Sequence, residues 1–595
     1  MNVRRRVVSP VAAGVLAIFT SLTAAGLPSV AHAATDGVPI THEENPRVPE
    51  GAAWTQTYFP SSDGSGVELH ADILRPAHLP ARAKTPVILS VGPYFSHAGE
   101  TSPGGFDQVG PSPRFQDLID GARLMERGYT FVMVDLRGFG GSTGCLDFLG
   151  PGEQADIKAA VEWAARQPWS TGKVGMYGKS YDANTGLAAN VLKLKPLKAI
   201  VAQEPTWNRY NYLYSNGVPR SNATSSPRSY YSIATMPQLG DDSDRYKANA
   251  DYEKSHPECQ INNATSTQDP DPKSAFWRAR DFASRAAGSR TPLFVTSGFI
   301  EDNTKPEDMQ KYLNNHHGPE RGWLGQWEHV RGNETDNNGQ LKMGRAGWFD
   351  EVMRFYDQHL RGIKPSVKDP AFSVEDSLGD WRAQPTWPVT NDSYTARLSP
   401  GRYVDDGGQA AQRTVETPAA GWDIEYAQAA GSPTVAVVDE PGNSYWSFST
   451  PASKQVRLTG TPEIALKTKG EGNVWVRLWD VAPDGRATMF NEMVAALNDR
   501  STSFPLKATD WTFEQGHQLG VQIGTITSRG WRPVPSGQTI TVTDARLAIE
   551  VQDPRFDSPT QGDRSPYLDR YLTANTITLD TVGAPTFPLR VSKKH

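Results

Sequence analysis

Between residues 54 and 330 the hydrophobic pattern changes repeatedly from short apolar runs to stretches with helical spacing. The stretch 152–167 predicts a helix, because Ile157, Ala160, Val161 and Ala164 recur on one helical face. Apolar runs predict strands at Val67–Leu74, Pro86–Val91, Tyr129–Asp135, Lys173–Tyr177, Leu197–Gln203, Thr291–Ser297 and Gly322–Trp327. Strands that alternate with helices are typical of an α/β fold with crossover helices.

Two changes of pattern divide the rest of the chain. Residues 205–287 are rich in Pro, Asn, Ser and Asp and separate two predicted strands, which indicates a cap inserted into the α/β domain. From about residue 366, short alternating strands separated by turns are typical of an all-β sandwich. We therefore expect an α/β domain over residues 35–365 and a C-terminal β-sandwich over residues 366–595.

The first 34 residues have the order of a signal peptide. Arg4-Arg5-Arg6 precedes an apolar run over residues 11–26, and Ala31-His32-Ala33 has the small residues of a cleavage site. The run is shorter than the ~20 residues that a membrane-spanning helix needs. The sequence thus predicts a secreted, extracellular protein that is cleaved near Ala33 and has no membrane attachment afterwards.

Composition narrows the classes of function. The 595 residues carry 60 basic and 66 acidic side chains, a net charge of −6, so no basic excess favours nucleic acid as a partner. The 16 Trp, 20 Tyr and 21 Phe indicate a globular chain. Cys145 and Cys259 are the two cysteines; in an exported protein they form either a disulfide or two buried thiols.

Two glycine-rich segments resemble nucleotide-binding motifs without completing them. Gly178-Lys179-Ser180 would be a phosphate-binding loop only with glycine in place of Lys173. The segment 138–143 ends in Thr143 where a dinucleotide fingerprint needs glycine. We expect no nucleotide, no metal and no other cofactor.

Ser180 has the surroundings of a nucleophile on a strand–turn–helix elbow. A predicted strand ends just before it, and the alanine-rich stretch Ala183–Leu192 predicts a helix just after it. Gly178 is small, as the tight turn requires, but Asp182 stands where the general G-x-S-x-G pattern has its second glycine. A serine that caps a helix is the alternative interpretation.

A serine nucleophile needs a base, and α/β-hydrolases carry serine, acid and histidine in this order along the chain. Seven histidines follow Ser180, and His329 alone lies directly after the last predicted strand of the α/β domain. The acid is expected after the preceding strand, where Glu301 and Asp302 are neighbours. Either carboxylate could orient His329.

Several motifs together resemble the family of X-Pro dipeptidyl-peptidases and cocaine-esterase-like hydrolases, over about residues 54–552. They are Gly178-Lys179-Ser180-Tyr181-Asp182, Gln167-Pro168-Trp169-Ser170, and Asp135-Leu136-Arg137-Gly138-Phe139-Gly140-Gly141-Ser142. The family pattern G-x-S-Y-x-G is matched through Tyr181 and departs at Ala183. Its acid motif, Gly-x-x-Asp-x-Asn, aligns with residues 298–303 and places Glu301 in the register of the acid, with Asp302 as the alternative. Residues 325–329 resemble its histidine loop.

The resemblance implies a fold and an oxyanion hole. The fold is an α/β-hydrolase domain with a helical cap, followed by a C-terminal jelly-roll sandwich. Gly92-Pro93-Tyr94 resembles the segment whose tyrosine hydroxyl binds the oxyanion together with the backbone N–H after the nucleophile. Those donors would be Tyr94 and Tyr181.

These observations predict a secreted serine hydrolase with Ser180 as nucleophile, His329 as base and Glu301 as acid. The resemblance favours an Xaa-Pro dipeptidyl-peptidase, which must bind a free amine, and Glu204 just after a predicted strand is the candidate for that contact. An esterase or β-lactam acylase acting on a small acyl substrate shares every motif. The alternative from another class is an inactive protein whose sandwich binds carbohydrate or cell wall.

Overall fold

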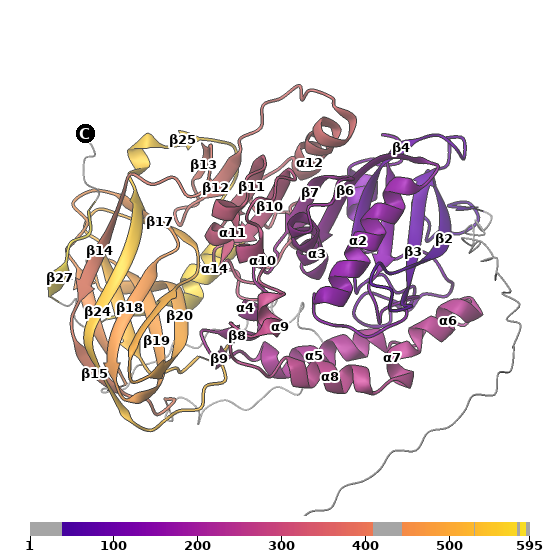
Figure 1. Cartoon of the computed structure of the whole chain (residues 1–595). Coiled ribbons are helices and arrows are strands. Elements are labelled where there is room, and N and C mark those ends of the chain that lie inside the picture. The colour runs from indigo at the N-terminus through magenta and orange to yellow at the C-terminus, as the bar shows by residue number, and fades with distance from the viewer. Residues whose placement is uncertain (1–38, 409–442, 529, 580–583, 591–595) are drawn as a thin grey trace, which may run out of the picture. The chain divides into compact units, whose positions relative to one another are not determined.

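The computed structural model describes residues 39–408, 443–528, 530–579 and 584–590. The signal peptide expected over residues 1–34 therefore lies outside the described residues. The described residues belong to one compact unit. It contains an α/β part with an inserted helical cap, and a β-sandwich drawn in orange to yellow in Figure 1.

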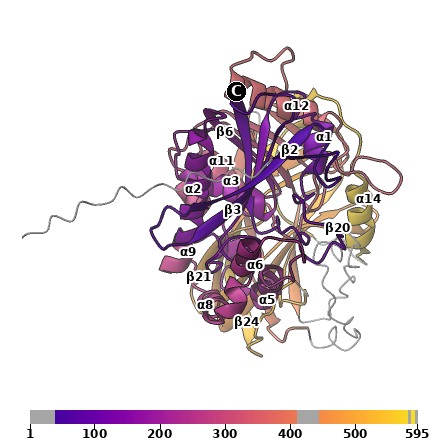
Figure 2. The same ribbon diagram turned by 90° about the vertical axis from the view of Figure 1, so that its right-hand side faces the viewer.

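A twelve-stranded sheet forms the centre of the α/β part, in the order β1-β2-β3-β5-β4-β6-β7-β10-β11-β12-β13-β25. The strands from β5 through β12 in this order run parallel to their neighbours, and the flanking pairs are antiparallel. β2 and β3 face the viewer in Figure 2. The bounds are β1 Ile40–Thr41, β2 Ala52–Pro60, β3 Glu68–Pro76, β4 Thr85–Gly92, β5 Thr130–Asp135, β6 Ser170–Lys179, β7 Leu197–Gln203, β10 Leu293–Gly298, β11 Glu320–Gly325, β12 Phe372–Glu375, β13 Trp381–Gln384 and β25 Ser558–Pro559.

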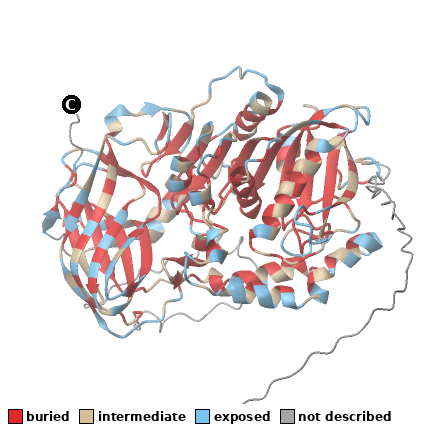
Figure 3. Ribbon diagram, in the orientation of Figure 1, coloured by how far each residue is buried: buried red, intermediate tan, exposed pale blue. Residues whose placement is uncertain are grey.

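The central strands of this sheet are buried on both sides (Figure 3), as is typical of parallel strands that helices cover on both faces. Successive residues of β4 point to opposite faces: Val87 and Leu89 pack in one apolar core with α2 and α3, and Ile88 packs in another with α1 and α12. The helices are α1 Gln116–Gly121, α2 Pro151–Arg166, α3 Tyr181–Val191, α11 Met309–Asn315, α12 Trp348–Tyr356 and the π-helical turn Asp357–Arg361.

The cap is the segment between β7 and β10, as the break in the alternation indicates. It consists of short helices and one two-stranded hairpin, and a disulfide between Cys145 and Cys259 joins α8 to the loop after β5. Its elements are α4 Tyr210–Leu213, β8 Tyr214–Ser215, β9 Val218–Pro219, α5 Asn222–Ala234, α6 Asp244–Ala250, α7 Tyr252–Ser255, α8 Glu258–Ser266, α9 Ala275–Arg278 and α10 Phe282–Arg285.

Two sheets pack face to face in the C-terminal part, with alternate residues such as Ile464 and Leu466 in the core between them. The first sheet contains β14 Asp392–Leu398, β15 Gly401–Val404, β17 Val456–Gly460, β18 Glu463–Lys469, β21 Ser501–Pro505, β22 Thr509–Phe513 and β24 Thr539–Gln552. The second contains β16 Ser444–Ser449, β19 Glu471–Val481, β20 Arg486–Asn498, β23 Gln518–Gly524, β26 Thr576–Thr578 and β27 Pro585–Phe587. The strand pairs of these two sheets are antiparallel except for β16 and β27, which run parallel. The 3₁₀ turn Pro554–Phe556 and helix α14, Pro566–Asn575, follow β24.

The fold class expected from the sequence, an α/β-hydrolase domain with a cap and a C-terminal sandwich, is confirmed. Two strands beyond the expected boundary at residue 365, β12 and β13, pair with the first sheet and not with the sandwich. Short strands at the edge of a sheet have the same pattern as strands of a sandwich. The sequence pattern alone therefore could not assign them.

Candidate active site

Ser180 occupies a strained turn between β6 and α3. Its backbone has φ 65° and ψ −122°, in a region that residues with a side chain rarely adopt. A Cβ at Gly178 would lie 2.3 Å from the carbonyl carbon of Asp182, so only glycine fits there. The N–H of Ser180 donates to the carbonyl oxygen of Gln203 at 2.9 Å. This geometry is that of a nucleophile elbow, and it holds the serine at the end of its strand.

Asp182 explains the departure from the general motif. Its side chain fills the space beside Gly92, where a Cβ would lie 1.7 Å from Oδ1. Arg114 Nε donates to Asp182 Oδ2 at 2.5 Å. Burial raises the pKa of Asp182 to about 6, although Arg114 acts to lower it. Asp182 can therefore occupy the position of the second glycine, because Gly92 on the neighbouring strand leaves space for its side chain and Arg114 pairs with its carboxylate.

The parallel strands bring Ser180, Glu301 and His329 to one edge of the sheet. β6, β7, β10 and β11 are consecutive and parallel. Ser180 follows β6, Glu301 follows β10 and His329 follows β11, each at the carboxyl end of its strand. Active sites of open α/β sheets lie at this edge. The order of the three residues along the chain is that of an α/β-hydrolase triad.

Glu301 is the carboxylate that lies beside His329. Its Oε1 is 3.2 Å from Nδ1 of His329, and only 1% of its side chain is exposed. The backbone N–H groups of Asn303 and Thr304 each donate to Oε1 at 2.9 Å, and Oγ1 of Thr304 donates to Oε2 at 2.8 Å. Burial acts to raise the pKa of Glu301, but His329 and these donors lower it to about 2. An ionised Glu301 can orient the imidazole and compensate its positive charge.

Asp302, the alternative acid, is directed to other partners. Its Oδ1 lies 3.3 Å from Nζ of Lys507 and 3.7 Å from Nζ of Lys305. More than half of its side chain, 57%, is exposed. The geometry therefore favours Glu301 over Asp302 as the triad acid.

Glu204, the candidate for the substrate amine, is fully engaged inside the protein. Its carboxylate accepts hydrogen bonds at 2.9 Å from Thr296 Oγ1, from the N–H of Gly298 and from Nε1 of Trp327. Burial and the charge of Glu301 raise its pKa to about 8. Since the side chain is only 1% exposed, we reassign Glu204 to positioning β10 and the loop of His329.

Tyr94 and Tyr181, the expected oxyanion donors, lie on two neighbouring elements. Tyr94 follows β4, which pairs with β6, and Tyr181 begins α3, where the helix dipole favours negative charge. The Tyr181 hydroxyl donates to Glu153 Oε2 at 2.8 Å, which leaves its backbone N–H as the relevant donor. The hydroxyl of Tyr94 is 3.1 Å from that of Tyr230 on α5.

Tyr230 and Arg209 are residues of this site that sequence reasoning missed. The ring of Tyr230 packs 5.2 Å from the ring of Tyr181, centroid to centroid, besides its contact with Tyr94. Arg209 is 2% exposed and its guanidinium lies over the rings of Tyr181 and Tyr212, at 4.8 and 4.4 Å. Both come from the segment after β7, where the sequence shows no recognisable motif. The cap therefore supplies side chains next to the two residues expected to form the oxyanion hole.

Together these residues suit acyl transfer through a serine. The described residues include one cluster with the spacing of metal ligands, His70, Asp72 and His97, and it lies outside this site. Over the same part of the chain, every helix is too short or too polar to cross a bilayer.

Two family models match the chain one after the other. Residues 63–331 match the model described as X-Pro dipeptidyl-peptidase (S15 family), a range that includes Ser180, Glu301 and His329. Residues 362–562 match the model described as the X-Pro dipeptidyl-peptidase C-terminal non-catalytic domain. The two matches cover most of the described chain.

Relatives with sequence similarity include peptidases and esterases. A protein of Streptomyces avermitilis with the provisional name Xaa-Pro dipeptidyl-peptidase is 26% identical, over 95% of this chain and 87% of its own length. The cocaine esterase of a Rhodococcus species is 22% identical, over 77% of this chain and 88% of its own length. Sequence similarity therefore extends to both reaction types.

Solved structures show the same fold at lower identity. An α-amino acid ester hydrolase superposes with a TM-score of 0.61 at 18% identity, over 84% of this chain and 97% of that one. An aminopeptidase of a Thaumarchaeota archaeon gives 0.59 at 18% identity, with the same coverage of both chains.

Proposed function

The chain belongs to the X-Pro dipeptidyl-peptidase family of α/β-hydrolases, and on that premise we propose that it releases N-terminal dipeptides with proline in the second position. The observation that carries the reaction is the strained Ser180 on the same sheet edge as the Glu301–His329 pair. The peptidase relative over nearly the whole chain favours a peptide substrate.

In the proposed mechanism Ser180 Oγ attacks the carbonyl carbon of the proline residue, and Nε2 of His329 accepts the hydroxyl proton. Glu301 holds Nδ1–H and compensates the imidazolium charge. The Tyr94 hydroxyl and the N–H of Tyr181 donate to the developing oxyanion. His329 then gives its proton to the leaving amine. In the second half of the reaction His329 accepts a proton from water, which attacks the acyl-enzyme, and returns it to Ser180 Oγ.

The aromatic side chains beside the oxyanion donors support the preference for proline. The rings of Tyr94 and Tyr181 both pack against the ring of Tyr230. Arg209 lies over the rings of Tyr181 and Tyr212. Flat aromatic rings offer apolar area to a proline ring without loss of many rotamers. The cap brings Tyr230 and Tyr212 to this place, so the cap contributes to selectivity.

We also propose that the protein is exported and acts outside the cell. The signal-like pattern before residue 35 supports this, and so does the Cys145–Cys259 disulfide, because disulfides persist in oxidising compartments. Mass spectrometry of the culture medium tests it: we expect a mature chain that starts near residue 34. Retention of the whole chain inside the cell would contradict export.

A comparison of substrates tests the proposed reaction. Initial rates are measured on the 4-nitroanilides of Ala-Pro and Gly-Pro, on Ala-Ala anilide, on N-acetyl-Ala-Pro anilide and on a short acyl ester, with Ser180→Ala as the blank. We expect Ala-Pro and Gly-Pro anilides to give the highest kcat/KM, Ala-Ala to be at least about tenfold slower, and the acetylated substrate to be poor. Preferred hydrolysis of the acyl ester, with no effect of proline, would assign the enzyme to the esterases instead.

A further inference from the structure

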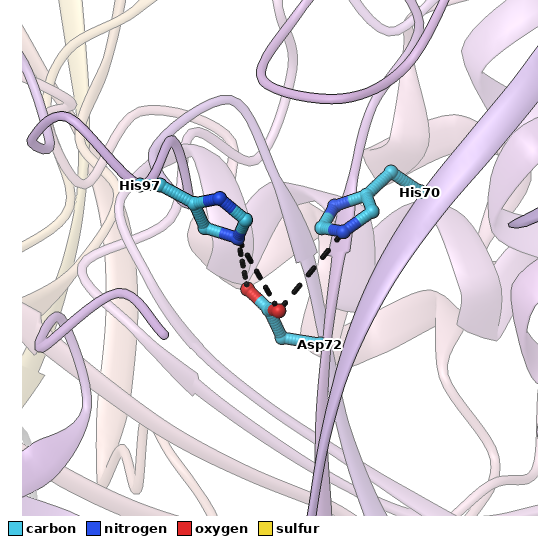
Figure 4. Close-up of side chains that lie close together, drawn as sticks. All are labelled: His70, Asp72 and His97. Atoms are coloured by element: carbon cyan, nitrogen blue, oxygen red, sulfur yellow. Dashed lines mark hydrogen bonds and ion pairs between the residues drawn. The ribbon is translucent and has the colours of Figure 1, made fainter. Parts of the chain in front are cut away.

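Two buried imidazoles, of His70 and His97, converge on the carboxylate of Asp72, and none of these three residues belongs to the proposed triad (Figure 4). His70 and Asp72 are on the same side of β3, and His97 is in the loop after β4. Nε2 of His97 lies 3.4 Å from Asp72 Oδ2, and Nε2 of His70 lies 4.0 Å from Oδ1. All three side chains are at most 1% exposed.

A second carboxylate orients each imidazole from behind. Nδ1 of His70 is 2.9 Å from Asp135 Oδ2, and Nδ1 of His97 is 2.6 Å from Asp242 Oδ1. When each Nδ1–H is donated outward, the lone pair of each Nε2 is directed to the common point beside Asp72. Metal-binding histidines have this same arrangement, in which a carboxylate fixes the tautomer and increases the basicity of the ligand.

The charges of the cluster call for positive compensation. Asp72, Asp135 and Asp242 bring three carboxylates into a region closed to water, and Arg47, which acts electrostatically on Asp72 and Asp242, is partly buried nearby. Either two protons on the imidazoles or one divalent cation supplies two further positive charges. Buried carboxylates are stable only when such charge is present.

We propose that His70, Asp72 and His97 bind a divalent transition-metal ion, with Zn²⁺ as the best match. Zn²⁺ prefers nitrogen and carboxylate ligands in a tetrahedron at about 2.0–2.1 Å, which separates neighbouring ligand atoms by about 3.3 Å. Nε2 of His97 lies 3.4 Å from Asp72 Oδ1, and Nε2 of His70 lies 4.0 Å from the same oxygen. The three ligand atoms lie within 4.8 Å of one another, so a bound ion would draw them closer together. Gln56 Oε1, 3.1 Å from Nε2 of His70, is placed to be the fourth ligand. The sequence alone predicted no metal.

The site would be structural, because its ligands are not members of the proposed triad and the cluster connects β3, the loop of Tyr94 and the cap. His97 lies three residues after Tyr94 in the same loop. Asp242 comes from the cap, and so does Tyr246, whose ring stacks on His97 at 4.2 Å and whose hydroxyl accepts from the N–H of His97. A bound ion would therefore fix the loop of Tyr94 and the cap against β3. The proposal does not depend on which substrate the enzyme takes.

Metal analysis of the full chain, purified without a histidine tag, tests the proposal. After dialysis against a chelator and addition of one equivalent of Zn²⁺, we expect about one tightly held ion per chain and a rise in Tm of several degrees. His97→Gln should lose both effects. His517→Gln is the matched control, because His517 pairs with Asp480 at 2.7 Å and belongs to no such cluster among the described residues. It should behave as the wild type.

The visible absorption spectrum of bound Co²⁺ is a second test, and it requires no variant. Co²⁺ bound to the wild-type chain by two nitrogens and two oxygens should show the intense visible absorption of a tetrahedral site, and Zn²⁺ should abolish it. A chain that holds under a tenth of an equivalent of Zn²⁺, shows no rise in Tm and gives only the faint spectrum of hydrated Co²⁺ would overturn the proposal. The cluster would then be a hydrogen-bonded network that carries protons in place of a metal.

Discussion

Oε1 of Glu301 lies 3.2 Å from Nδ1 of His329 and makes Glu301 the carboxylate that can orient the imidazole. The choice between Glu301 and Asp302 was open in the sequence, since the family register favoured the first and the usual residue type the second. The longer glutamate side chain is held by N–H donors of its own loop. The loop therefore accommodates the extra methylene without displacing the acid.

Substitution of each carboxylate by its amide tests this assignment. Glu301→Gln should lower kcat on the order of 10³–10⁴-fold, because an amide cannot compensate the imidazolium charge. Asp302→Asn is the matched control and should lose under about tenfold, since Asp302 is paired with Lys507. Steady-state kinetics on the best substrate measures both. A larger decrease in kcat for Asp302→Asn than for Glu301→Gln would identify Asp302 as the acid. Small decreases for both variants would show that the acid follows another strand.

Tyr94→Phe should lower kcat by roughly 10²-fold with a smaller effect on KM, because its hydrogen bond strengthens as the oxyanion develops. Tyr230→Phe should lower kcat by less, since its hydroxyl only positions that of Tyr94. Tyr214→Phe is the control, because the Tyr214 hydroxyl donates to Thr267 within the cap. An effect of Tyr94→Phe on KM alone would place Tyr94 in substrate packing instead.

The low pKa of Glu301 predicts a dependence of stability on pH. The folded value is about 2 and the ordinary value is 4.5, so the unfolded chain binds more protons between these pH values. The contribution of Glu301 is fully present above pH 4.5 and is lost as the pH falls to about 2. At ~1.36 kcal/mol per pKa unit, the loss is about 3 kcal/mol.

Urea unfolding of the wild type and Glu301→Gln at several pH values measures this contribution. The free energy of unfolding of the wild type should fall more steeply below pH 4.5, by about 3 kcal/mol in total. Parallel curves for the two proteins would show that the carboxylate is not stabilised in the folded state.

The double variant Cys145→Ser/Cys259→Ser should unfold at a lower urea concentration than the wild type. The disulfide closes a loop of 114 residues, and its loss increases the conformational entropy of the unfolded chain. This lowers the free energy of unfolding by up to ~4.7 kcal/mol at room temperature. The wild type under a reductant should unfold like the variant. Equal midpoints for oxidised and reduced wild type would contradict a stabilising role for this bond.

Local patterns in the sequence predicted the central strands, the elbow and the histidine, because each depends on neighbours a few residues away. The apolar run before Ser180 and the small Gly178 are sufficient to indicate the turn. His329 follows from the topology, since only one histidine comes directly after the last predicted strand. Such features can be recognised from the hydrophobic periodicity and from the position of a residue relative to a predicted strand.

Contacts between distant segments could not be predicted in this way. The hydroxyl of Tyr230 makes a hydrogen bond with that of Tyr94, from which it is separated by 136 residues in the sequence. No local sequence pattern distinguishes Tyr230 from the other tyrosines of the cap. The role of Glu204 depended on Trp327, which is 123 residues away. The strand β12 pairs with β11, although its own pattern suits either sheet. Each of these required knowledge of the packing.

A fluorophosphonate probe tests most directly whether Ser180 is the activated nucleophile. Peptide mass spectrometry should find one adduct, on Ser180, that forms in parallel with the loss of peptidase activity. Ser180→Ala should take up no probe and keep less than about a hundredth of the wild-type kcat. We expect the same of His329→Ala, because Ser180 and His329 act together in the proton transfer. An adduct on another serine, or turnover by Ser180→Ala near the wild-type rate, would contradict the assignment of Ser180.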